Sequence, residues 1–174
     1  MPIPKRVETY LKKANKKFDV VAHKTVFTAY DLAQTLKRGL KEIGKTLLVK
    51  ADKAYVLVVV PASSRIDFKK LKKALRAKNV AMVPEKVMVK VLKVKPGALT
   101  AFGGLHKLEI IADRGLGKTK EIILQAGSFT DSVRMKVKDF LAMEQAKLAS
   151  ISGAAGYTAP KAKAKKAKRK INRK

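Results

Sequence analysis

The sequence predicts a single compact α/β domain, built on a mixed, largely antiparallel central sheet flanked by helices and followed by a disordered basic C-terminal tail. Three observations predict this fold class. The chain has 174 residues, 47% of them hydrophobic, which suits one core. Segments typical of strands outnumber helical ones, and several neighbours are joined by short connections. After residue 150 the sequence changes to a linker and a lysine-rich segment. We therefore expect a domain at 1–150 and a linker with its tail at 151–174.

The N-terminal third is predicted to form a helix, a strand and a second helix. Apolar residues at helical spacing, with lysines opposite, predict a helix at 7–14. The segment 18–23 is typical of a short strand. Thr28 is a candidate N-cap with Asp31 three residues later, so we expect a helix to begin there and to end at Gly39.

The middle of the chain is predicted to form a hairpin followed by two short helices. Asp67 is a candidate N-cap, and Pro84 can open a helix because its fixed φ suits the first helical position. Asp52 and Lys53 connect the two runs of the hairpin. In order, the expected elements are strands 45–51 and 54–62, a helix 67–78, a strand 79–83 and a helix 84–92.

The last third is predicted to contain a glycine-bearing loop, three strands and a closing helix. The loop, 93–104, carries three glycines. Asp113, which closes the first of these strands, is either a turn residue before Arg114-Gly115 or a site residue. The expected elements are strands 108–113, 121–127 and 132–137 and a helix 138–150.

The segment 39–46, GLKEIGKT, fits the phosphate-loop pattern G-x-x-x-x-G-K-[ST]. That motif works where a strand enters the loop and a helix leaves it, so that free N–H groups face phosphate. Here a helix precedes the motif and a strand follows. A second GKT, 117–119, lacks the upstream glycine. We do not expect a nucleotide hydrolase. Lys45 instead enters a central strand, either as a solvated charge or as a donor to a carbonyl or phosphate oxygen.

The positive charge predicts a polyanionic partner. The formal net charge is +28, and the nine cations of the tail leave 28 − 9 = 19 on residues 1–160. Nucleic acid is the leading candidate, because each neutralised phosphate releases a counterion. The alternatives are a solubilising surface or a general bias toward lysine. The tail residues expected to contact nucleic acid are Lys161, Lys163, Lys165, Lys166, Lys168, Arg169, Lys170, Arg173 and Lys174.

Several other kinds of chemistry find little support in the sequence. The absence of Cys excludes disulfides and thiolate nucleophiles. His23 and His106 have no neighbour at metal-ligand spacing, so we expect neither a metal nor another cofactor. The N-terminus has no signal-peptide core, and the longest apolar run, 54–62, is too short for a membrane helix. We expect a cytoplasmic protein without a membrane partner.

The order of five segments resembles the YbaK and prolyl-tRNA-synthetase-associated domain family, whose members are trans-editing aminoacyl-tRNA deacylases. The likeness runs from about His23 to Leu141. The segments are FTAYDLAQTL, GKTLLVKAD, YVLVVVPASSRIDFKKLKKAL, KPGALTAFGGL with LEIIAD, and EIILQAGSFTDSVRMKVKDFL. The resemblance implies a YbaK-like α/β fold and metal-independent hydrolysis of the ester that joins a wrong amino acid to tRNA. The implied partner is mischarged tRNA, with association to an aminoacyl-tRNA synthetase as a further option.

The resemblance also implies roles for residues of this chain. Lys45 falls on the family's lysine and would orient the aminoacyl end and stabilise charge on the ester oxygen. Gly97, Ala98 and Thr100 of the glycine loop would assist the attack of water through backbone groups. The residues implied in substrate binding are Thr28, Tyr30, Thr46, Gly103, Asp113, Gly127, Ser128 and Phe129.

Two positions depart from the family pattern. Ala101 stands where relatives often carry Pro, which leaves the loop backbone less restricted. Phe129 stands where many relatives carry His. These departures keep a second hypothesis open, a non-catalytic tRNA-, RNA- or ribosome-binding protein on the same scaffold. The lysine tail lies outside the family pattern and would hold RNA with little sequence preference.

Overall fold

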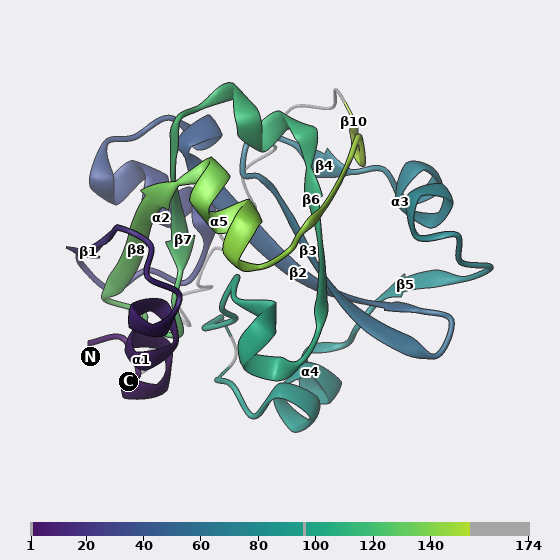
Figure 1. The fold of residues 1–174 in the computed structure, drawn as a ribbon, viewed down its shortest axis with the longest axis horizontal. Coiled ribbons are helices and arrows are strands. Elements are labelled where there is room, and N and C mark those ends of the chain that lie inside the picture. The colour runs from purple at the N-terminus through teal and green to yellow at the C-terminus, as the bar shows by residue number, and fades with distance from the viewer. Residues whose placement is uncertain (1, 96, 154–174) are drawn as a thin grey trace, which may run out of the picture.

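The computed structural model describes residues 2–95 and 97–153, which fold around one mixed β-sheet (Figure 1). The strand order is β1-β8-β7-β2-β3-β6-β9, and β5 pairs with β2 beside this path. The strands are β1 (Phe18–Ala22), β2 (Ile43–Ala51), β3 (Ala54–Pro61), β5 (Val80–Met82), β6 (Glu109–Asp113), β7 (Glu121–Gln125), β8 (Asp131–Lys136) and β9 (Lys147–Ala149). A second, two-stranded sheet pairs β4 (Arg65–Ile66) with β10 (Ser152–Gly153).

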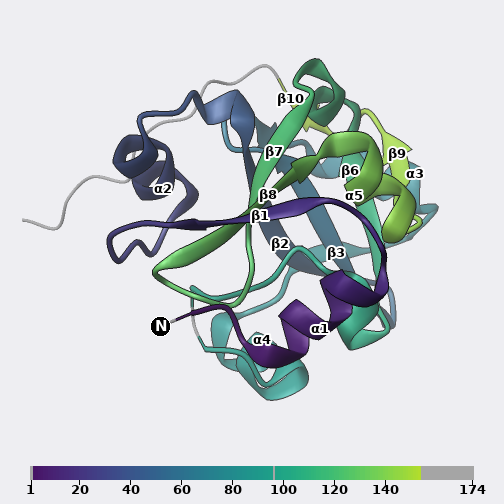
Figure 2. The ribbon, with the colours of Figure 1, turned by 60° about the vertical axis from the view of Figure 1, so that its left-hand side comes forward.

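Short helices cover the faces and ends of this sheet. They are α1 (Lys5–Lys13), α2 (Ala29–Leu36), α3 (Phe68–Leu75), α4 (Glu85–Leu92) and α5 (Val137–Met143), with 3₁₀ helices η1 (Leu40–Glu42), η2 (Gly103–His106) and η3 (Arg114–Lys118). In both ribbon views α1 and α4 lie at the lower end of the molecule, and α2 lies at its left side (Figures 1 and 2). None of the helices within residues 2–95 and 97–153 has the length and apolar character needed to cross a membrane.

The predicted α/β class with a mixed sheet is confirmed. Pairs β2–β3, β2–β5, β7–β8 and β1–β8 are antiparallel, whereas β2–β7, β3–β6 and β6–β9 are parallel. The central hairpin pairs Gly44 through Ala51 with Ala54 through Pro61. The alternating side chains of its strands enter two apolar clusters, one on each face, because successive residues of a strand point to opposite sides.

The helix caps follow the sequence closely. The Thr28 hydroxyl accepts a hydrogen bond from the Asp31 N–H at 3.0 Å, and the Asp67 carboxylate accepts from the N–H groups of Lys69 and Lys70. The helix α2 ends at Leu36, before the expected Gly39, because Lys37 already takes a left-handed conformation.

The predicted helix at 138–150 is wrong in its second half. The helix α5 ends at Met143, and Lys147–Ala149 forms β9, which pairs in parallel with β6. Residues 147–149 pair with the outer edge of β6, which would stay unpaired if the helix continued. Tertiary context therefore overrides the local helical preference. Ile151 is fully buried, and β10 pairs with β4, so the packed domain extends to residue 153.

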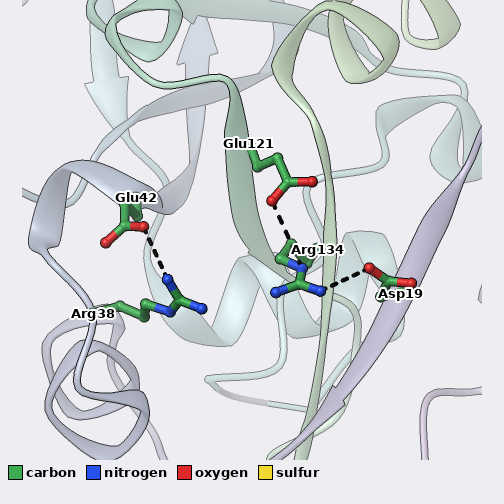
Figure 3. A network of polar contacts seen from close by, with 5 residues as sticks. All are labelled: Asp19, Arg38, Glu42, Glu121 and Arg134. Carbon is green, nitrogen blue, oxygen red and sulfur yellow. Dashed lines mark hydrogen bonds and ion pairs between the residues drawn. The ribbon is translucent and has the colours of Figure 1, made fainter.

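An arginine links three strands at one end of the sheet. Arg134 of β8 lies between two acids, and its guanidinium is 2.9 Å from Asp19 of β1 and 3.9 Å from Glu121 of β7 (Figure 3). The Asp19 carboxylate raises the pKa of Arg134, first through its hydrogen bond and then through its charge. Because these pairs are largely exposed, each contributes little to the stability of the fold.

Candidate functional site: a cavity at an interrupted strand edge

Lys45 lies at a gap in the sheet. One edge of β2 pairs with β3 from Gly44 to Ala51. The other edge pairs with β7 only at Ile43–Gly44 and with β5 only at Val49–Ala51. Between these two short ladders β2 is open on one side. The segment GKT therefore belongs to a strand entered from η1, which confirms that 39–46 is not a phosphate loop.

A cavity of about 420 Å³ occupies this gap. Its walls come from the start of α2, the open part of β2, the end of β3, the region between β5 and α4, the glycine loop and the end of β7. The lining residues are Phe27, Thr28, Ala29, Tyr30, Lys45, Thr46, Leu47, Leu48, Ala62, Met82, Val83, Met88, Gly97, Leu99 and Gln125. Most of these are apolar, so charged and polar groups within the cavity are poorly hydrated.

Lys45 is the cation of this cavity. Its side chain is half-buried, and burial lowers the pKa of its ammonium group, assisted by the positive charge of Arg65. No carboxylate forms an ion pair with Lys45 among the residues that the structure describes. A half-buried ammonium without a counterion is well suited to bind a ligand oxygen that carries negative charge.

Thr46 adds unpaired polar groups beside Lys45. Its Oγ1 is buried and has no hydrogen-bond partner within the described part of the chain. The Ile43 carbonyl accepts from Ala62 on the β3 side, whereas the Leu48 carbonyl accepts from Val83 on the opposite side. Because peptide groups alternate along a strand, the N–H and C=O of Thr46 face the same side as those of Leu48, toward the gap. Thr46 thus turns a backbone donor and a backbone acceptor toward the gap, and its buried hydroxyl has no protein partner among the described residues.

The glycine loop forms the opposite wall and is fixed by its neighbours. The Gln125 Nε2 donates to the Gly97 carbonyl at 3.4 Å. Ala98 and Thr100 are buried, and a Cβ on Gly127 would lie 3.3 Å from Thr100 Cγ2. Gly97 and Gly127 both have positive φ, at 77° and 81°, which favours glycine. The loop and the turn at 127–128 therefore pack directly against each other.

Two aromatic rings meet at the rim of the cavity. Phe27, 62% exposed, packs on Phe129 with ring centroids 5.3 Å apart. A Cβ on Gly97 would lie 3.2 Å from the Phe129 ring. Ser128, next to Phe129, accepts hydrogen bonds from the N–H groups of Thr130 and Asp131, which holds the turn. Phe129 is thus an apolar part of the rim.

The structure brings most of the residues implied as site residues to this region, but two lie elsewhere. Thr28, Tyr30, Lys45, Thr46 and Gly97 line the cavity, and Ala98, Thr100, Gly127, Ser128 and Phe129 lie behind or beside its wall.

Gly103 belongs to η2, where a Cβ would collide with Ile110 and with the Leu108 carbonyl. Asp113 is 3% exposed, and its carboxylate accepts hydrogen bonds from the N–H groups of Gly115, Ile151 and Ser152. The tail residues from Lys161 onward lie outside the described residues.

Sequence reasoning missed the apolar wall. Met82 ends β5, Val83 follows it and Met88 lies in α4. These segments carry no motif, and only the gap between β5 and β7 brings the three residues together. Within residues 2–95 and 97–153, no group of three or more His, Cys, Asp or Glu side chains could hold a metal ion.

Comparison with known proteins identifies the family of the chain. The model of the aminoacyl-tRNA editing domain matches residues 23–143. Similar sequences occur in the proline–tRNA ligases of Thermosipho melanesiensis, 29% identical over 109 residues, and Macrococcus caseolyticus, 32% identical over 91 residues. These matches cover 63% and 52% of this chain but only 19% and 16% of the ligases, so the chain spans less than a fifth of their length.

Solved structures share the fold. A proposed trans-editing enzyme for prolyl-tRNA synthetase superposes with a TM-score of 0.76 at 20% identity, over 85% of this chain and 95% of that one. A protein described only as hypothetical superposes with a TM-score of 0.80 at 19% identity, over 86% of this chain and 100% of that one. The chain belongs to the aminoacyl-tRNA editing domain family.

Proposed function

We propose that this protein is an aminoacyl-tRNA deacylase that hydrolyses the ester bond of mischarged tRNA, with Lys45 as its central site residue. The observation that carries the proposal is the half-buried, unpaired Lys45 ammonium in a largely apolar cavity, within a chain of the editing-domain family. The family likeness to proline–tRNA ligases supports a tRNA substrate and association with prolyl-tRNA synthetase.

In the proposed mechanism Lys45 donates a hydrogen bond to the carbonyl oxygen of the ester. As water attacks the carbonyl carbon, negative charge grows on this oxygen and the ammonium stabilises it. The bond between the carbonyl carbon and the ribose oxygen then breaks, and the ribose oxygen takes up a proton. The polar groups of Thr46 and the backbone of Gly97–Thr100 orient the aminoacyl end, and no covalent enzyme intermediate is needed.

The apolar wall would select the side chain of the amino acid. Met82, Met88 and Leu99 face a space that suits an aminoacyl group, and methionine side chains adapt their shape readily. Discrimination in such a pocket operates at the scale of single methyl groups. A panel of mischarged tRNAs is therefore the direct way to identify the substrate.

The test is deacylation of that panel by the wild type and by Lys45→Ala. The panel includes the tRNA for proline mischarged with alanine or with cysteine. We expect Lys45→Ala to lower kcat by roughly 100-fold or more, the usual loss when a charge-stabilising donor is removed, with tRNA affinity nearly unchanged. The matched control is Lys53→Ala, an exposed lysine in the turn of the same hairpin, which should retain wild-type turnover.

Two outcomes would contradict this proposal. Turnover that falls only in proportion to tRNA affinity would assign Lys45 to binding. A wild type that binds tRNA in a salt-sensitive manner but hydrolyses no member of the panel would support the non-catalytic RNA-binding protein, for which Phe129 at the rim is the motivating observation.

A further inference from the structure

A second hollow lies on the other side of the segment 61–65 from the Lys45 cavity. It has a volume of about 370 Å³. Ala62 lines the Lys45 cavity, whereas its neighbours Pro61 and Ser63 line this hollow, so the two spaces are adjacent. The remaining lining residues are Lys41, Ser64, Lys70, Asp113, Arg114, Gly115, Lys118, Ser150 and Ser152. They come from η1, α3, the end of β6, η3 and the approach to β10.

Three of the four cations in this hollow form no ion pair with the described residues. They are Lys41, Arg114 and Lys118. Lys70 donates to the Ser152 carbonyl at 3.2 Å. Four cations and one carboxylate therefore line the hollow, a formal charge of 4 − 1 = +3. A concentration of one sign of charge in a hollow attracts anions.

The carboxylate in the hollow accepts hydrogen bonds from backbone groups of the protein. Asp113 Oδ2 accepts from the Gly115 N–H at 2.9 Å, and Oδ1 accepts from Ile151 at 2.9 Å and Ser152 at 3.1 Å. It therefore joins η3 to the chain before β10 and holds the cationic residues of η3 in place. Because both oxygens are occupied and the side chain is 3% exposed, Asp113 is not available as an ion-pair partner for the cations.

Three serine hydroxyls also line the hollow. Ser63, Ser64 and Ser150 line it, and no side-chain hydrogen bond holds their hydroxyls within the part of the chain that the structure describes. Hydroxyl donors combined with a guanidinium and ammonium groups are the donors that bind phosphate in proteins. Lys118, the lysine of the second GKT segment, also lines a neighbouring hollow. Four lysines and two glutamates line that hollow, so a net positive charge continues around η3.

We propose that this hollow, defined by Lys41, Arg114, Lys118 and the three serines, binds a backbone phosphate of the tRNA strand whose aminoacylated end enters the Lys45 cavity. The inference rests on the proposed function for the identity of the RNA. Adjacency supports the assignment, because a strand that ends in the cavity passes its nearest phosphates over the surface around the cavity, and this hollow is a cationic part of that surface. The site positions the strand and takes no part in bond breaking.

The experiment compares two doubly substituted proteins that lose the same charge. Arg114→Ala/Lys118→Ala removes two cations of the hollow. Lys13→Ala/Lys17→Ala removes two exposed cations at and after the end of α1, which lies at the lower left of Figure 1, whereas β4 and β10 beside the hollow lie at the upper right. Equilibrium binding of uncharged tRNA is measured over a range of salt concentrations, and deacylation is measured for each protein.

We expect the hollow variant to weaken tRNA binding and to reduce the slope of log K against log salt by about 0.7, because the hollow binds one phosphate and each single-stranded phosphate contact contributes about 0.7. The α1 variant should change the slope less. In turnover, KM should rise for the hollow variant while kcat is retained. Equal changes of slope in both variants would overturn the proposal, since they would report net charge alone.

A chemically modified RNA locates the contact. Neutral methylphosphonate linkages near the 3′ end of an acceptor-stem RNA should abolish the difference between the wild type and Arg114→Ala/Lys118→Ala, because the group that these residues bind is then uncharged. A difference that persists would overturn the proposal. So would binding of inorganic phosphate in the hollow with no effect of the substitutions on RNA affinity, which would make it a small-anion site. Because these measurements need no hydrolysis, they remain decisive if the deacylase proposal fails.

Discussion

The two hollows on either side of the segment 61–65 hold positive charge in opposite ways. In the Lys45 cavity one ammonium is half-buried among mostly apolar side chains, and burial lowers its pKa. In the neighbouring hollow, Lys41, Arg114 and Lys118 are exposed, and serine hydroxyls surround them. The first arrangement strengthens one interaction by excluding water, whereas the second collects several weak, solvated ones.

The two arrangements suit two different tasks in the binding of one tRNA substrate. Stabilising charge on a single ester oxygen requires a fixed donor in a poorly hydrated place, because the interaction must be strong at one atom. Retaining a long polyanion requires several exposed cations, whose contribution depends on salt and tolerates variation in geometry. The supports also differ, since apolar contacts frame the cavity and the hydrogen bonds of Asp113 frame the hollow.

The largest expected effect is a loss of stability when Asp113, whose hydrogen bonds support the hollow, is replaced. Asp113→Ala should lower the free energy of unfolding by roughly 3–5 kcal/mol, because three backbone N–H groups lose a shared acceptor and each unsatisfied buried donor costs about 1–3 kcal/mol. Urea unfolding at 25 °C measures this loss. Asp52→Ala is the control, since Asp52 also accepts from backbone N–H groups, those of Lys78 and Asn79, but is exposed and should cost far less. Equal losses for both variants would contradict a structural role specific to Asp113.

Most of the fold could be predicted because the signals are local. Thr28 and Asp67 cap their helices through hydrogen bonds within the next three residues, and the hairpin turns at Asp52 as expected. Lys147–Ala149 could not be predicted as a strand, because only the distant β6 makes it one. Periodicity reports the neighbours of a residue along the chain, and the edge of a sheet is not among them.

The candidate site shows the same limit. Lys45 was marked by its place at the entry of a central strand and by the resemblance to a family, and it does line the cavity. Asp113, a scarce acid at a strand end, was expected either as a turn residue or as a site residue, and its carboxylate accepts hydrogen bonds from backbone groups of η3 and of the segment before β10. A strand-end carboxylate looks the same in sequence in either role, and only its partners distinguish them.

A smaller effect should follow when the hydroxyl of Thr46 is removed. Thr46→Val keeps the shape and deletes a buried oxygen that has no protein partner, so the free energy of unfolding should change by less than about 1 kcal/mol. If the hydroxyl binds the aminoacyl group, kcat/KM should fall by about tenfold, which corresponds to about 1.4 kcal/mol. Thr46→Ser retains the hydroxyl and should recover most of this activity. Activity that tracks the methyl group rather than the hydroxyl would assign Thr46 to packing.

The smallest expected effect is a shift in the pH dependence of deacylation. It tests whether the surroundings of Lys45 lower the pKa of its ammonium group. Burial and the charge of Arg65 both lower the pKa of Lys45, so the protonated donor should be lost at a lower pH than for an ordinary lysine. Enzymatic deacylation, corrected for spontaneous ester hydrolysis, should then decline as pH rises through this pKa. Arg65→Ala removes a repelling charge, raises the pKa of Lys45 and should move the decline to higher pH, whereas Arg65→Lys should leave it in place. A decline that moves to lower pH in Arg65→Ala would contradict the electrostatic assignment, because removing a positive neighbour can only favour the charged form of Lys45.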